Sequence, residues 1–261
     1  MTEHGPAGSG LPDGAETCLS FTVSGPWGHF RRIEGNIVKQ TYRVIPRTTV
    51  AGLIAAMLGI ERDGYYDLFA PGESLVAIEP TSELRTMKLP MNTLSTADEH
   101  MASLNPRGKL SIKLPDPSKP RQQHNYEVLV DPAYRIDVWL DDERYDRLRS
   151  LLESGESYYA PSLGLSEYLA TVDYHGEFPI EQGPDGDTVA IDSTVPEAVD
   201  SIVPDPETRY QIEQTPAFME RDDGGRTTSA FVSYAYNPDG DSLTFTDVAT
   251  YSVDDRTVVF T

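Results

Sequence analysis

Cysteine is nearly absent from this sequence, and its absence excludes several classes of protein. The 261 residues contain one cysteine, Cys18. A single thiol can neither close an intramolecular disulfide nor build a cysteine-based zinc cluster. The five histidines are scattered without metal-ligand spacing. We therefore expect no metal site and no cofactor.

Long hydrophobic runs and a secretory leader are also missing. The longest apolar stretch, residues 50–60, has 11 residues, whereas a bilayer-spanning helix needs about 20. Residues 1–17 lack the basic region and the apolar run of a signal peptide. We expect a cytoplasmic protein with no membrane partner.

Enzyme signatures are scarce as well. The sequence has no GxxxxGK[ST] phosphate loop, no HExxH zinc motif and no GxSxG nucleophile elbow. These absences argue against the nucleotide-hydrolysing, zinc-protease and serine-hydrolase classes.

Lysine is rare, and acidic residues dominate the charge. The net charge is -21, from 42 Asp and Glu against 21 Lys and Arg, and only five of the basic residues are lysines. An acidic, lysine-poor surface is typical of halophilic adaptation, because it resists aggregation when salt screens charge. An acidic partner-binding surface is the alternative. Under the halophilic interpretation, only local departures from the acidic background indicate ligands.

Positive charge departs from that background in two stretches. Residues 1–149 hold 17 basic and 20 acidic residues, a net charge of -3, whereas residues 150–261 hold 4 and 22, a net charge of -18. Residues 31–47 and 107–121 are net positive and contain four of the five lysines. A sequence that avoids lysine elsewhere indicates a need for positive charge here.

The first basic stretch alternates with aromatic residues, as in proteins that bind single-stranded RNA by stacking and phosphate contacts. The candidate residues are Trp27, His29, Phe30, Arg31, Arg32, Lys39, Tyr42 and Arg43. The alternative is that Trp27 and Phe30 belong to the core and that the arginines pair with acidic residues.

The second basic stretch lies in a long polar, proline-containing segment, residues 81–133. A structureless loop of this length is unusual in a compact domain. We expect a projecting hairpin with residues 83–94 and 122–130 as its arms and residues 105–120 as a mobile tip. The cations of this stretch could bind around an RNA strand, or they could be incidental charge on a solvated loop. They are Arg107, Lys109, Lys113, Lys119 and Arg121.

The remaining pattern predicts an α+β fold. After a disordered tail, residues 1–16, we expect strands at 17–23, 36–45, 74–79, 133–140 and 168–178. One helix is expected after Pro46, with Thr48 or Thr49 as its cap and first residues, and it is predicted to stop at Gly59. A second helix is expected at 141–152. This order approximates a βαββαβ ferredoxin-like (RRM-like) unit over residues 17–180, with the hairpin inserted at about residues 81–133. Residues 181–261 are predicted to form a small, acidic, β-rich C-terminal segment.

Three runs carry a family resemblance: FTVSGPWGHFRRIEGNIVKQTYRVIPRTTVAGLIAAMLGI (21–60), YEVLVDPAYRIDVWL (126–140) and YYAPSLGLSEYLA (158–170). They resemble the RAMP-type CRISPR-associated family whose members cap the 5′ end of the guide RNA in Cascade, especially its type I-B form. The resemblance covers about residues 17–175.

The resemblance implies a ferredoxin-like RAMP domain with a β-hairpin thumb. It implies a non-catalytic subunit that holds the 5′ handle of the CRISPR RNA (crRNA) in antiviral defence. The implied protein partners are the repeating backbone subunit of Cascade and the large PAM-sensing subunit. By position, the residues near the handle would be Arg31, Arg32, Lys39, Arg43 and Arg47, the last at a helix start that favours phosphate. The thumb residues Arg107, Lys109 and Lys113 would contact RNA beside the adjacent backbone subunit.

Two other functions remain open. The type I-C branch of the family cleaves precursor RNA without metal, through a Tyr/His/Lys-like group. Here His124 and Tyr126 would face the same side of one hairpin arm and, with Lys88 or Lys113, could imitate that set. Type I-B systems use a separate endonuclease, so we expect no catalytic residues. The last alternative is a protein-interaction module without RNA affinity of its own.

Overall fold

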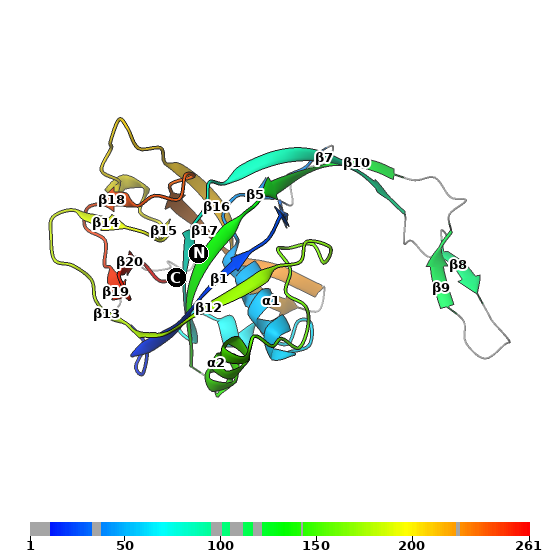
Figure 1. The fold of residues 1–261 in the computed structure, drawn as a ribbon, viewed down its shortest axis with the longest axis horizontal. Coiled ribbons are helices and arrows are strands. Elements are labelled where there is room, and N and C mark those ends of the chain that lie inside the picture. The colour runs from blue at the N-terminus through cyan, green and yellow to red at the C-terminus, as the bar shows by residue number, and fades with distance from the viewer. Residues whose placement is uncertain are drawn as a thin grey trace.

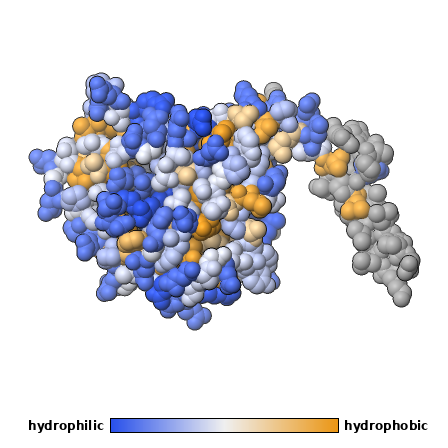
Figure 2. All heavy atoms as spheres, viewed as in Figure 1, coloured by the Kyte–Doolittle hydropathy of each residue, from blue (hydrophilic) through white to orange (hydrophobic). Residues whose placement is uncertain are grey.

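The structure is a computed structural model that describes residues 11–32, 38–94, 101–104, 112–116, 122–141, 143–222 and 225–261. It consists of a mostly β body with few helices, from which a long two-stranded ribbon projects (Figure 1). Hydrophilic side chains dominate the face seen in Figure 2, where hydrophobic ones form small separate groups. No helix in the described part of the chain is long and apolar enough to cross a membrane.

A four-stranded antiparallel sheet organises the body. Its strands, in spatial order, are β12 (Thr171–Pro179), β1 (Thr17–Ser24), β11 (Ala133–Leu140) and β6 (Ser74–Pro80). Helix α1 (Arg47–Leu58) lies between β1 and β6 in the chain, and α2 (Arg144–Ser154) lies between β11 and β12. Successive side chains of β1 and β11 point to opposite faces of the sheet, as they do in any β-strand.

The two faces of the sheet belong to two hydrophobic clusters. Leu19 and Phe21 of β1 face the cluster that contains the buried residues of α1 and α2. Cys18 of β1 and Trp139 of β11 face a second cluster, which is completed by Val253 and Val258 from the C-terminal segment. The sheet is therefore covered by helices on one side and by C-terminal strands on the other.

Helix α1 stops at the glycine that the sequence predicts, but it begins before the predicted cap at Thr48 or Thr49. Pro46 occupies the N-cap position, and Gly59 ends the helix in the left-handed conformation, with φ 74°. The Gly59 N–H donates to the carbonyls of Ala55 and Ala56, which satisfies helix-end acceptors as a glycine C-cap does.

The projecting ribbon pairs β7 (Arg85–Thr93) with β10 (Gln122–Val130) in antiparallel register. These strands coincide with the predicted arms, residues 83–94 and 122–130. Beyond them, β8 (Met101–Leu104) pairs with β9 (Ile112–Pro115). Most of the predicted tip, including Arg107, Lys109, Lys119 and Arg121, lies outside the described residues.

The C-terminal segment is built from short strands and one long hairpin. The hairpin pairs β16 (Gln211–Asp222) with β17 (Gly225–Tyr236). The short strands are β13 (Glu181–Gln182), β14 (Val189–Ile191), β15 (Val195–Pro196), β18 (Leu243–Phe245), β19 (Tyr251–Val253) and β20 (Arg256–Val258). Single-turn 3₁₀ helices lie at Asp67–Phe69 and Val199–Ser201. The sequence pattern predicted a β-rich segment here but did not predict β16.

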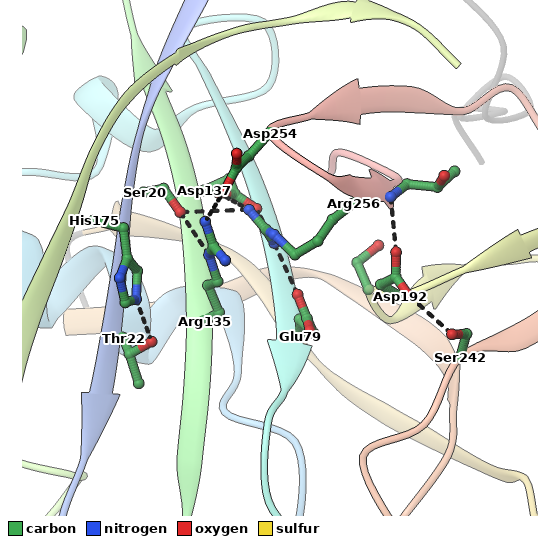
Figure 3. A network of polar contacts seen from close by, with 12 residues as sticks. Ser20, Thr22, Glu79, Arg135, Asp137, His175, Asp192, Ser242, Asp254 and Arg256 are labelled. Atoms are coloured by element: carbon green, nitrogen blue, oxygen red, sulfur yellow. Dashed lines mark hydrogen bonds and ion pairs between the residues drawn. The ribbon is translucent and has the colours of Figure 1, made fainter. Parts of the chain in front are cut away.

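A buried polar network joins the C-terminal segment to the sheet (Figure 3). Arg256 of β20 donates through Nη2 to Asp137 Oδ1 at 2.7 Å and through Nη1 to Glu79 Oε2 at 2.8 Å. Arg135 Nε donates to Ser20 Oγ at 2.9 Å and its guanidinium pairs with Asp254 at 3.2 Å. Because Asp137 is 1% exposed and Arg256 is 8% exposed, these charges stabilise one another inside the protein.

Two predictions about the N-terminal part need correction. Residues 11–16 are not a disordered tail, because Ala15 is buried and the Ile180 N–H donates to the Glu16 carbonyl. Residues 1–10 lie outside the described residues. The strand predicted over residues 36–45 is also wrong: its described part holds two separate two-residue strands, β4 (Val38–Lys39) and β5 (Thr41–Tyr42).

Candidate nucleic-acid interface

The first basic stretch folds around the base of the ribbon. Strands β2 (Trp27–Gly28) and β4 pair with β10, the first antiparallel and the second parallel. Strand β3 (Phe30–Arg31) pairs with β5. These four short strands hold Trp27, Arg31, Lys39 and Tyr42 beside the point where the ribbon leaves the body, and Arg32 and Arg43 directly follow two of them.

Loop 161–170 packs directly against this region and fixes its backbone. The His29 N–H donates to the Leu163 carbonyl at 3.0 Å. Gly164 has φ +92°, and a Cβ built there would lie 2.0 Å from the His29 carbonyl oxygen. The Leu163–Glu167 turn is therefore a packing element.

His29 and Phe30 point inward. Phe30 is a core residue, 2% exposed, as the structural alternative predicted. His29 is 1% exposed, its Nδ1–H donates to the Glu127 carbonyl at 2.8 Å, and its ring contacts the edge of Tyr126. Burial lowers the pKa of His29, and the charge of Arg31 lowers it further. The RNA-binding assignment of His29 is corrected, since a buried neutral imidazole cannot reach a phosphate in this structure.

Tyr42 is also turned inward, under the side chain of Arg32. It is 7% exposed, and the Arg32 guanidinium lies 5.2 Å from its ring centroid. A cation over the ring face is a favourable arrangement. Tyr42 therefore supports Arg32 rather than offering a free ring for base stacking, which corrects its predicted role.

Two predicted arginines pair with acidic residues. Arg32 lies 3.6 Å from Glu213, and Arg43 lies 3.9 Å from Glu127. Glu213, from the unpredicted strand β16, also accepts the backbone N–H groups of Arg43 and Val44 at 2.7 and 3.1 Å. Burial raises the pKa of Glu213, and these hydrogen bonds oppose that rise. The side chains of Arg32 and Arg43 remain 39% and 31% exposed, so each keeps part of its surface for a ligand.

Arg47 is a structural residue, and its predicted contact with RNA is wrong. It is 1% exposed. Its guanidinium donates to the Phe69 carbonyl at 2.7 Å and to Ser74 Oγ at 2.7 Å, and it lies over the Phe218 ring. Burial lowers the pKa of Arg47 to about 10, so the buried side chain stays charged at neutral pH. The donors that would bind phosphate are used inside the protein.

The remaining candidates are accessible. Arg31 is exposed, while Trp27 and Lys39 are half-buried. No carboxylate in the described ranges forms an ion pair with Arg31 or Lys39. Arg31 lies opposite Thr41, and Lys39 lies opposite Tyr126 on β10. Together with the exposed parts of Arg32 and Arg43, they form a basic surface at the base of the ribbon.

The predicted thumb cations are only partly described. Lys113 lies in β9, opposite Ser103 of β8. Arg107, Lys109 and Arg121 lie outside the described residues. Exposed Leu114 of β9 and Met87 of β7 show that the ribbon also carries hydrophobic surface.

The possible nuclease residues do not share one face of the ribbon. His124 and Tyr126 alternate to the same face of β10, where they lie opposite Met91 and Leu89. Lys88 lies opposite Glu127, which places it on the other face. Tyr126 also packs against His29. The described residues hold no cluster of three or more His, Cys, Asp or Glu suited to a metal ion.

The sequence profile of a family described as "CRISPR-associated protein (Cas_Cas5)" matches residues 18–232. The chain belongs to the Cas5 family of CRISPR-associated proteins. No curated protein is significantly similar to it in sequence.

Two solved structures share the fold of this Cas5-family chain. A chain of a "CRISPR RNA-guided surveillance complex" is 12% identical, with a TM-score of 0.51 over 87% of this chain and 91% of that one. A CRISPR protein from Archaeoglobus fulgidus is 14% identical, with a TM-score of 0.52 over 93% of this chain and 98% of that one. The shared fold extends over nearly the full length of both.

Proposed function

We propose that this Cas5-family protein is a non-catalytic subunit of a type I CRISPR interference complex, where it binds the 5′ handle of the crRNA. The observation that carries the proposal is the basic surface of Arg31 and Lys39 at the base of the ribbon. It is open to solvent in a chain of net charge -21. Side chains of this kind bind phosphate through charge-assisted contacts.

The fold supports the assignment of the body to a ferredoxin-like RAMP domain. The chain order β1, α1, β6, β11, α2, β12 is βαββαβ, and the sheet order β12-β1-β11-β6 follows the pattern of that motif. In this proposal the β7–β10 ribbon is the thumb, inserted between β6 and β11.

The covered sheet limits where RNA can bind. RRM domains stack bases on an open sheet face, but here the face of Cys18 and Trp139 is packed against Val253 and Val258. The RNA would therefore run along β2–β5 at the ribbon base, and the C-terminal segment acts as a structural cover.

The protein partners in this proposal are the repeating backbone subunit and the large PAM-sensing subunit. The ribbon reaches away from the body (Figure 1) and exposes Met87, Leu94 and Leu114. A projecting element with apolar side chains fits a neighbouring subunit better than it fits solvent. In this proposal the protein caps the backbone of a cytoplasmic complex, and its acidic surface reflects adaptation to high salt.

Metal-independent cleavage of precursor crRNA is the enzymatic alternative. The same-face placement of His124 and Tyr126 favours it, whereas Lys88, one of the two lysines considered as their accompanying cation, lies on the opposite face. The proposal therefore keeps RNA binding without catalysis as the function.

The test is binding of the full chain to an eight-nucleotide repeat-derived handle and to a scrambled RNA, in molar KCl with EDTA. We expect tighter binding to the handle and intact RNA on a denaturing gel. The double variant Arg31→Ser/Lys39→Ser should bind at least tenfold more weakly. Arg144→Ser/Arg147→Ser removes the same charge from exposed positions on α2 and is the matched control.

Three other outcomes would contradict different parts of this proposal. Discrete RNA cleavage would favour the nuclease. Unchanged binding of the Arg31/Lys39 variant, in a folded sample, would remove the basic surface from the proposal. Retention of crRNA by a purified complex carrying that variant would favour a protein-interaction module.

A further inference from the structure

A second surface with RNA-binding chemistry, which no sequence pattern indicated, lies over the outer face of helix α1. Two adjoining hollows of about 390 and about 710 Å³ share Gly52, Ala56, Tyr65 and Arg226 in their linings. The first also contains Arg31, and the second also contains Tyr159 and Arg62. We call the two hollows together the α1 groove.

Small residues form the floor of the α1 groove. Thr48, Gly52 and Ala56 follow one another at helical spacing of four, so they lie on one face of α1. A Cβ at Gly52 would lie 3.2 Å from the Tyr65 hydroxyl oxygen. The Tyr65 hydroxyl therefore lies directly over Gly52, and the lack of a side chain there lets the tyrosine ring lie close to the helix.

Two tyrosines stand beside this floor. Tyr65 packs edge-on against Tyr66 and Phe69, which hold its ring. Tyr159 is 51% exposed, and its backbone N–H donates to the Ala56 carbonyl at 3.1 Å, which ties its segment to the end of α1. Fixed aromatic rings on an accessible surface are the usual platforms for nucleobases.

The charge of the groove is opposite to that of the chain. Arg31, Arg62 and Arg226 line it, and Glu61 is the one carboxylate among the lining residues described. Arg226 is one of only four basic residues in residues 150–261. It is held 3.5 Å from Asp63 and keeps a 43% exposed side chain.

We propose that the α1 groove binds one nucleotide of a single-stranded RNA whose neighbouring phosphates contact Arg31. The base stacks against the exposed ring of Tyr159, and Arg62 and Arg226 bind the adjoining phosphate. The inference rests on the proposed function, because it extends the path of the RNA from the ribbon base along α1. Arg31 belongs to both surfaces, and this continuity favours one RNA strand as the occupant over a separate acidic peptide.

The experiment measures binding of the full chain to handle RNAs that carry 2-aminopurine at one position at a time. Stacking should quench the fluorescence at one position in particular. Tyr159→Ala should restore that fluorescence and weaken binding roughly 5- to 100-fold, the usual effect of losing one stacked base. Tyr210→Ala is the matched control, because Tyr210 is similarly exposed, at 48%, and does not line the groove.

A second variant keeps the test decisive if Tyr159→Ala fails to fold. Arg62→Ser changes an exposed side chain and should weaken RNA binding and reduce its dependence on salt. Arg147→Ser, with the same change on α2, should do neither.

The outcomes separate this inference from the proposed function. If the Tyr159 and Arg62 variants bind like the wild type while Arg31→Ser/Lys39→Ser binds weakly, the groove is not an RNA site and the proposed function stands. If none of these variants changes binding, both proposals fail. If the Tyr159 variant keeps its RNA affinity but no longer joins a complex with the backbone subunit, the groove is a protein interface and the inference is overturned.

Discussion

Gly164 presses against the carbonyl of His29 so closely that no side chain fits between them. A Cβ at Gly164 would lie 2.0 Å from the His29 oxygen, and Gly164 has a φ of +92°. This contact holds loop 161–170 against the strands that carry Arg31.

We expect Gly164→Ala to lower the free energy of unfolding by on the order of 3 kcal/mol or more, because the clash adds to backbone strain. It should also weaken handle binding, since the backbone next to Arg31 must move. Gly14→Ala is the control: Gly14 has φ +90° but open space around it, so only the strain of about 1 kcal/mol applies. Denaturant unfolding of both variants makes the comparison, and equal losses would contradict the packing role.

Arg256 should hold the C-terminal segment on the sheet. Arg256→Met leaves the buried carboxylates of Asp137 and Glu79 without their partner, which typically costs about 3–5 kcal/mol. The double variant Arg256→Met/Asp137→Leu should recover part of this loss, because it removes the more deeply buried of the two uncompensated carboxylates. Thermal unfolding provides the measurement.

Arg149→Met is the control for Arg256. Arg149 pairs with Asp146 and Glu177 on the surface, and exposed pairs typically contribute less than about 1 kcal/mol. Equal losses of stability from the Arg149 and Arg256 variants would contradict the network's structural role.

His29 should make stability depend on pH. Burial lowers the pKa of His29 below its usual 6.5, with Arg31 adding to this shift and Glu127 and Glu167 opposing it. The unfolded chain therefore binds the proton more readily, and this contribution to stability is complete above about pH 6.5 and declines as the pH falls below it. The slope from one proton is at most about 1.4 kcal/mol per pH unit.

The measurement is the unfolding free energy of the wild type and of His29→Gln between pH 7.5 and 5. The variant should show the shallower slope. His175→Gln is the comparison, because His175 is exposed, and its pKa is also lowered, by partial burial and by the charge of Arg135. A wild-type slope unchanged by His29→Gln would show that other groups control the pH dependence.

Variants of Arg47 and Arg31 should have opposite effects: one should lower stability and the other should weaken RNA binding. Arg47→Met orphans the buried acceptors at Phe69 and Ser74, at roughly 1–3 kcal/mol for each. The RNA affinity of the folded fraction should not change. Arg31→Ser should do the reverse, leaving stability within about 0.5 kcal/mol while weakening RNA binding. Calorimetric unfolding and RNA titration of both variants test this pair, and weaker RNA binding by folded Arg47→Met would restore its predicted contact.

Local patterns predicted the elements better than they predicted the roles of single side chains. The end of α1 at Gly59 and the arms of the ribbon follow from glycine, proline and alternation within a few residues. Arg47 occupies a helix start, which suggested a phosphate site. Its burial depends on carbonyls and hydroxyls 22 and 27 residues away, which no local pattern reveals.

The same limit applies to the candidate site. Glu213 lies about 170 residues after the arginines and backbone groups that it binds, and Tyr65 meets Arg226 only in the folded chain. The one available signal was the sequence Asp-Asp-Gly-Gly at residues 222–225, because Asp-Gly is typical of hairpins and would have indicated the β16–β17 pair.

The Arg256 network also joins parts of the chain that are synthesised at different times. Asp137 precedes Arg256 by 119 residues, so at ~5–20 residues per second it emerges roughly 6–24 s before its partner. During that interval the C-terminal strands cannot yet cover the sheet face of Cys18 and Trp139. The carboxylates of Asp137 and Glu79 therefore remain hydrated on the nascent chain. This face can therefore be buried only after Val253, Arg256 and Val258 have been synthesised.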